Sequence, residues 1–229
     1  MYNACVNATR TPLPHFKRQL VPHDPHHVVL TVHADVPPLH RREIRELWLA
    51  LQALACRRYP GVSVSGGCLM PTHAHLILQS SGRAQDISRA IQFVASKLAI
   101  GINRIAGRSG AVYRDRFFSR PLSTVSELIH ALRYVGQNPV KARLVRRPED
   151  WAASSVPEYL GRARPTGAWA YRGWMYGVLG FLEHPARALA RILSGETRTR
   201  TPGRSRQTKL PFRRGLPVAA EPSARVSRR

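Results

Sequence analysis

The stretch Leu69-Met70-Pro71-Thr72-His73-Ala74-His75-Leu76-Ile77-Leu78 decides the fold of this chain. Its mostly apolar composition predicts a strand over residues 69–79, preceded by a short strand over residues 62–65 and a turn or bulge at Gly66-Gly67. Alternate residues of a strand project from the same face, so His73 and His75 present two imidazoles side by side. Such a pair is more often hydrogen-bonded or solvated than metal-bound, and it needs support from elsewhere in the chain.

Strands and helices alternate around this stretch. Residues 27–33 are β-branched and bounded by prolines, which predicts a strand. Residues 41–58 and 87–105 carry apolar side chains at three- and four-residue steps and predict two amphipathic helices. Residues 111–122 look extended, and Thr124-Val125-Ser126-Glu127 is a capping-box pattern for a further helix that Pro139 is expected to end.

This order of elements matches a split β-α-β plan. We therefore predict an α+β fold: a ferredoxin-like antiparallel sheet with covering helices, followed by the helix that starts near Thr124 and carries Tyr134, the candidate nucleophile discussed below. The predicted organisation is a loosely ordered lead-in over residues 1–25, a catalytic domain over 26–155, a helical extension over 156–194 and a disordered basic tail over 195–229. That tail holds ten Lys and Arg against two Glu.

Charge is the strongest compositional signal. The chain has 36 Lys and Arg against 13 Asp and Glu, a formal net charge of +23. An arginine-rich proteome would raise the basic content, but it would not explain the shortage of acids, so a polyanion such as nucleic acid is the expected partner.

The chain has three cysteines without a CxxC pair, which argues against a disulfide framework. No apolar run is long enough for a membrane span, and we expect a cytoplasmic, nucleoid-associated protein with no membrane partner.

The predicted helix that follows Thr124 adds a tyrosine to the histidine pair. Tyr134 and Asn138 are four residues apart and share one helix face. If that face lies over His73 and His75, Asn138 can supply an oxygen ligand while the Tyr134 phenol points at the metal. A purely structural interpretation, with Tyr134 as packing and Asn138 as a helix-terminal residue, stays open at this stage.

This combination suggests phosphoryl chemistry on DNA. A free phenol with a pKa near 10 is a weak nucleophile at neutral pH. A bound Mg²⁺ or Mn²⁺ would polarise the scissile phosphate and neutralise charge in the transition state. The product would be a 5′-phosphotyrosine, which keeps the bond reactive for strand transfer. Basic residues near the helix and the extended segment before it are the candidates for DNA contacts: Arg114, Arg116, Arg120, Arg133, Lys141 and Arg143.

These motifs resemble the single-tyrosine HUH transposases, and among them the REP-associated tyrosine transposases. The signature strand Met-Pro-Asn-His-Val-His-Leu corresponds to residues 70–76, and the helix end Tyr-Ile-His-x-Asn-Pro-Val corresponds to residues 134–140. Residues 110–117 are similar to the family's Gly-x-hydrophobic-x-x-Arg-Phe run, and residues 151–155 to its closing Trp-x-Ser-Ser piece. The resemblance covers about residues 25–155.

The resemblance implies a metal-dependent nuclease and strand transferase that cleaves single-stranded DNA beside a hairpin. His73, His75 and Asn138 would be the metal ligands and Tyr134 the nucleophile, in a monomer or a homodimer. Thr72, Ala74 and Gly136 depart from the family pattern, and Gly136 is expected to weaken the helix by up to about 1 kcal/mol relative to Ala.

Two other functions fit parts of the pattern. A histidine-triad hydrolase also uses alternating histidines on a strand, but its third histidine would fall at Ile77. A domesticated DNA-binding protein that keeps the fold without cleaving DNA is the stronger alternative. The presence of the tyrosine and both histidines favours an active enzyme.

Overall fold

The computed structural model describes residues 20–166, 168–169 and 185–195. Its elements, in chain order, are β1 (His26–Thr31), α1 (Arg42–Arg58), β2 (Val62–Leu69), β3 (His73–Ser80), α2 (Ala84–Ala106), β4 (Phe118–Pro121), α3 (Val125–Lys141), a 3-10 turn η1 (Pro148–Asp150), α4 (Val156–Tyr159) and α6 (Pro185–Ser194). The predicted lead-in before residue 20 and the tail after residue 195 lie outside the described residues, as does the part of the predicted helical extension between residues 170 and 184.

The four strands form one sheet in the order β2-β3-β1-β4, with every neighbouring pair antiparallel. Strands β1 and β2 therefore run parallel with β3 between them, and β3 and β4 run parallel with β1 between them. Each of these pairs is joined through one helix, which is the split β-α-β arrangement. The predicted α+β class, with a four-stranded antiparallel sheet and covering helices, is confirmed.

Some predicted boundaries were wrong. Leu69 belongs to β2, not to the histidine strand, and residues 70–72 form the connection to β3. The bulge falls between Val64 and Gly66 and lets β2 continue past the glycines. Only Phe118–Pro121 of the predicted extended segment pairs as a strand. The proline at position 139 does not end α3, which continues to Lys141; in the last helical turns its ring costs one backbone hydrogen bond without forcing a break.

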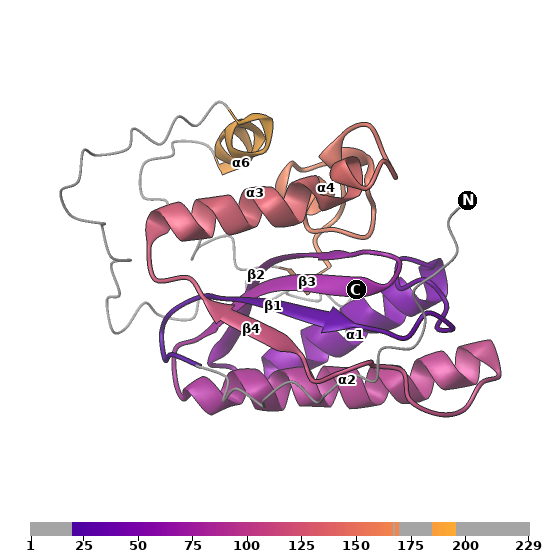
Figure 1. The fold of residues 1–229 in the computed structure, drawn as a ribbon. Helices are drawn as coiled ribbons and strands as arrows, with labels where there is room; N and C mark the ends of the chain where they lie inside the picture. Colours follow the sequence, from indigo (N-terminus) through magenta and orange to yellow (C-terminus); the bar gives the residue numbers. More distant parts are fainter. Residues whose placement is uncertain (1–19, 167, 170–184, 196–229) are drawn as a thin grey trace, which may run out of the picture.

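The sheet has helices on both faces (Figure 1), and a buried core lies on each face. Helices α1 and α2 cover one face, where Trp48 and Leu98 pack against Leu76 of β3. Helix α3 covers the other face, where Leu132 and other apolar residues of α3 form one buried cluster with Ile77. Because side chains alternate along β3, the strand contributes Ala74 and Leu76 to the first core and His75 and Ile77 to the second.

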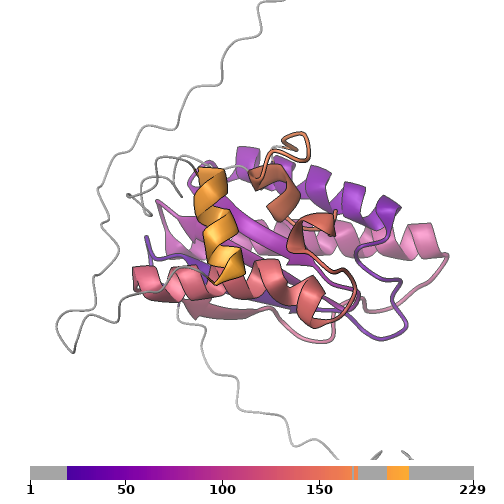
Figure 2. The same ribbon diagram turned by 90° about the horizontal axis from the view of Figure 1, so that it is seen from above.

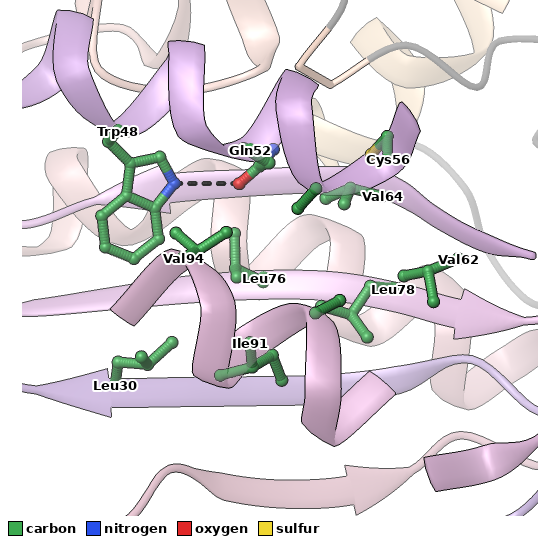
Figure 3. Close-up of a pocket in the computed structure, with 12 residues that line it drawn as sticks. Leu30, Trp48, Gln52, Cys56, Val62, Val64, Leu76, Leu78, Ile91 and Val94 are labelled. Atoms are coloured by element: carbon green, nitrogen blue, oxygen red, sulfur yellow. Dashed lines mark hydrogen bonds between the residues drawn. The ribbon is translucent and has the colours of Figure 1, made fainter. Parts of the chain in front are cut away.

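An apolar cavity of about 30 Å³ lies between the sheet and helices α1 and α2 (Figure 3). Trp48 Nε1 donates to Gln52 Oε1 across 2.9 Å at its edge. The side chains that β3 sends into this cavity, Leu76 and Leu78, are on the face opposite His75. The cavity is therefore a void in the packing of the first core, separate from the histidines.

The chain after α3 closes the second core. Residues 153–155 run along the free edge of β2, with Leu69 N donating to Ala153 O at 2.8 Å and Ser155 N to Gly67 O at 2.9 Å. Helix α6 crosses over α3 on its outer side (Figure 2) and buries Leu193 there. No helix within the described residues is long and apolar enough to cross a membrane.

Candidate active site

Three histidines project from the sheet face that α3 covers. His75 lies opposite Val29 in the β1–β3 register, and His27 lies opposite Ile77. His27 and His75 are thus diagonal neighbours on one face, with His73 two residues before His75 on the same strand. The ring centroids of His73 and His75 are 4.8 Å apart, and those of His27 and His75 are 5.1 Å apart.

His27 and His75 are joined by a hydrogen bond, with His27 Nε2 3.0 Å from His75 Nδ1. The second ring nitrogen of His75, Nε2, is buried and has no hydrogen-bond partner among the described residues. Burial lowers the pKa of His75 to about 3, with the nearby His27 and His73 contributing, and burial together with Arg120 lowers the pKa of His27 to about 4. Burial also lowers the pKa of His73. All three imidazoles are neutral at pH 7, as metal ligation requires.

Tyr134 of α3 stands over this cluster. Its ring meets His75 edge-on, with centroids 5.4 Å apart and planes at 87°, and it meets His27 at 5.9 Å. Tyr134 remains 43% exposed, so an incoming substrate can reach this residue from solvent. Lys141, two turns further along the helix, places its Nζ 5.0 Å from the centroid of the Tyr134 ring. Tyr134 therefore contacts Lys141 and the imidazoles of His27 and His75, and it lies on the solvent side of the buried His75.

The capping box at the start of α3 fixes the register that presents Tyr134. The Thr124 hydroxyl accepts a hydrogen bond from Glu127 N, and the Glu127 carboxylate accepts one from Thr124 N. Glu127 also pairs with Arg120 of β4 at 2.9 Å, which ties the helix start to the sheet. Leu128, Leu132 and Val135 form the seam that α3 buries, which leaves Tyr134 at its margin.

Asn138 lies one turn beyond Tyr134, half-buried, and its Nδ2 has no hydrogen-bond partner among the described residues. Because an amide can rotate to exchange its oxygen and nitrogen, that position can present an oxygen to a cation. Although His27, His73 and His75 lie close together, no three His, Cys, Asp or Glu side chains within the part of the chain that the structure describes are arranged so that all three could bind one metal ion. Two imidazoles and one amide oxygen are a set of a different kind, and the unpartnered atoms of His75 and Asn138 fit it.

The predicted DNA-contacting residues are spread over more than one region. Arg120 lies directly opposite His27 on β4, and Arg114 N donates to Thr31 O beside the strand end that faces His73. Lys141 adjoins Tyr134. Arg133 is directed away from Tyr134, because its guanidinium packs against Gly195 at the end of α6. Arg116 and Arg143 are exposed, and Arg143 has a left-handed backbone with φ of 58°.

His27 is the member of the cluster that the sequence did not identify as a site residue. It lies in a predicted strand, but the face on which a strand residue projects relative to a residue of another strand depends on their register. The preference of β1 for pairing with β3 in a split β-α-β sheet is the signal that could have drawn attention to His27. The register itself becomes known only from the fold.

Comparisons with known proteins support the fold. The structure of the REP-associated tyrosine transposase bound to a REP hairpin matches this chain with a TM-score of 0.56 and 17% sequence identity. The match covers 68% of this chain and 90% of that one. No protein-family model and no curated protein matches the sequence. The chain thus has the same fold as a REP-associated tyrosine transposase, at a level of identity that establishes the fold alone.

Proposed function

We propose that this protein is a metal-dependent single-stranded DNA endonuclease and strand transferase that cleaves near hairpins through a 5′-phosphotyrosine intermediate. The observation that carries the proposal is the edge-on contact between Tyr134 and His75, which sets a solvent-accessible phenol beside a buried imidazole with an unpartnered nitrogen.

The proposed reaction is an in-line displacement at phosphorus. The Tyr134 oxygen forms a bond to the scissile phosphorus and its proton passes to solvent, while the bond from phosphorus to the 3′ oxygen breaks. That oxygen leaves as a 3′ hydroxyl after taking up a proton from water. The 5′ end of the downstream strand is then held on Tyr134. Attack by a second 3′ hydroxyl reverses the step and joins the strand to a new partner.

His73, His75 and Asn138 are the residues that would hold a divalent ion. When bound, the ion polarises the scissile phosphate and neutralises charge that develops in the transition state. Imidazole ligands suit Mn²⁺ better than Mg²⁺, which prefers oxygen, so Mn²⁺ is the better probe of this site. The neutral state of both histidines leaves their lone pairs available without the release of a proton.

The fold and the charge support DNA as the substrate. The sheet has the ferredoxin-like strand order, and the solved transposase with the same fold is bound to a REP hairpin. The formal charge of +23 suits a polyanion. Lys141 beside Tyr134 and Arg120 opposite His27 would contact phosphates that flank the scissile bond.

Covalent capture tests the proposal. Wild-type protein with Mn²⁺ and a library of labelled single-stranded hairpin oligonucleotides should give a product that migrates as a protein–DNA adduct under denaturing conditions. Tyr134→Phe should give none, while the matched change Tyr59→Phe, at the end of α1 on the other side of the sheet, should behave as wild type. An adduct that persists in Tyr134→Phe would overturn the assignment of the nucleophile. Tight hairpin binding without any adduct in wild type would favour a DNA-binding protein that does not cleave.

A further inference from the structure

We propose that His27 is a positioning residue for His75: it accepts a hydrogen bond from His75 Nδ1–H and thereby fixes the tautomer that leaves the His75 Nε2 lone pair free to bind the metal. The inference rests on the proposed function, because it assigns a role within the same site. It identifies one residue outside the His-x-His pair and outside α3 on which metal binding depends.

The geometry of the two rings supports this direction of the hydrogen bond. His27 Nε2 and His75 Nδ1 are 3.0 Å apart, so one of them carries the shared hydrogen. If His27 donated it, the neutral His75 would carry its own hydrogen on Nε2, where it would be a buried donor without an acceptor in the described structure. If His75 donates it, Nε2 carries a lone pair that a cation can satisfy. The second arrangement gives both nitrogens of the His75 ring a partner once the metal is bound.

The contact resembles the hydrogen bond that usually orients the ring of a metal-binding histidine. Such a histidine donates its second ring N–H to a carboxylate, a carbonyl or water, which fixes the ring and its tautomer. Here the acceptor is another imidazole. The rings of His27 and His75 are inclined by only 27° with centroids 5.1 Å apart, so His27 also restricts rotation of the His75 ring. His27 Nε2 is committed to this contact, which distinguishes His27 from a third ligand.

Two substitutions at position 27 distinguish the effect of the hydrogen bond from the effect of the ring's shape. His27→Gln keeps a carbonyl oxygen that can accept from His75 Nδ1, whereas His27→Phe keeps a ring of similar size without an acceptor. His130→Gln, on the exposed side of α3, is the control for the loss of a histidine. Circular dichroism and thermal unfolding establish that each variant is folded before the comparison is made.

Two measurements test the proposal. Long-range ¹H–¹⁵N spectra of the wild-type protein without metal, assigned through the loss of signals in His75→Gln, should show His75 as the Nδ1–H tautomer. Titration with Mn²⁺ alone should show an affinity about 10- to 100-fold lower in His27→Phe than in wild type, with most of the affinity restored in His27→Gln and none lost in His130→Gln.

The outcomes distinguish this inference from the proposed function. An Nε2–H tautomer for His75, or wild-type Mn²⁺ affinity in His27→Phe, would overturn the role of His27 even if the DNA adduct forms. The expected tautomer and affinities without an adduct on any hairpin would support His27 and count against the nuclease. A wild-type protein that fails to bind Mn²⁺ would overturn both.

Discussion

Tyr134 and His75 meet edge-on at 5.4 Å between ring centroids, although one lies on a helix and the other on a strand of the sheet beneath it. The contact exists because α3 lies along the face of the sheet opposite α1 and α2, with Leu132 and Val135 buried beneath it and Tyr134 at the edge of the buried seam. The position of the candidate nucleophile is therefore set by the packing of a whole helix. Substitutions that shift α3 should therefore alter the site even when the substituted residue does not contact it.

Asn138 provides a test of the third ligand. Its Nδ2 is buried without a partner in the described structure, so Asn138→Leu should cost little stability, within about 1 kcal/mol, or even stabilise the fold. A ligand role requires the opposite effect on metal binding: the affinity for Mn²⁺ should fall at least about tenfold, since the amide oxygen is lost. Urea unfolding and Mn²⁺ titration of the same variant measure both. Unchanged Mn²⁺ affinity would restrict the ligand set to the histidines.

Gly136 is explained by α6. A Cβ at this position would lie 2.5 Å from Leu193 and 3.2 Å from Val156, so the absence of a side chain lets α6 and α4 approach α3. Helix propensity alone predicts that Gly136→Ala stabilises the helix by about 1 kcal/mol. We expect a net destabilisation of roughly 1–3 kcal/mol, because overpacking outweighs propensity.

A double-mutant cycle isolates this contact. Leu193→Ala removes the side chain that would meet the new methyl group, so Gly136→Ala should be less costly in that background than in wild type. Equal costs of Gly136→Ala in the two backgrounds would show that the α3–α6 contact does not determine the choice of glycine. Chemical denaturation of the four proteins gives the coupling free energy.

Much of the fold could be predicted because its signals are local. The alternation of Ala74 and Leu76 with His73 and His75 correctly gave the two faces of β3, and the Thr124–Glu127 capping box correctly gave the start of α3. Local rules placed the end of α3 at Pro139, but the helix continues to Lys141, because the buried Pro139 ring removes only one backbone hydrogen bond near the end of the helix. Leu69 was assigned to the wrong strand because its apolar character suits either side of the turn.

The remaining features of the site are set by long-range contacts. His27 reaches His75 only through the register of β1 on β3, and a shift of one residue would place it in the opposite core. Arg133 is next to Tyr134 in sequence, yet it packs against Gly195 because consecutive helical residues point about 100° apart. Sequence spacing identified the chemical groups, and the pairing of strands and helices determined which of them meet.

The histidine cluster predicts a loss of stability in acid. Folding lowers the pKa of His75 to about 3 and of His27 to about 4, from an ordinary value near 6.5. Between about pH 6.5 and 4 the unfolded chain therefore binds more protons than the folded one, and the free energy of unfolding falls as the pH is lowered through this window. Above it, these two groups make no pH-dependent contribution.

His27→Gln removes one of the two groups and should make this acid dependence shallower, since glutamine does not titrate. Urea unfolding of wild type and His27→Gln at several pH values between 7.5 and 4.5 measures both slopes. An equally steep slope in the variant would mean that protonation of His27 does not contribute to acid unfolding.

Lys141 should contact DNA phosphate at the scissile step. Its Nζ lies 5.0 Å from the centroid of the Tyr134 ring, so a phosphate in reach of the phenol is also in reach of the ammonium group. Each phosphate contact to single-stranded DNA contributes about 0.7 to the slope of log affinity against log salt concentration. Lys141→Ala should lower that slope by about this amount.

The control is Arg89→Ala, which removes an exposed cation from α2 on the other side of the sheet and should leave the salt dependence unchanged. Fluorescence anisotropy with one hairpin oligonucleotide over a range of salt concentrations measures the slopes, and equal losses in the two variants would show that general charge, not the position of Lys141, accounts for the effect.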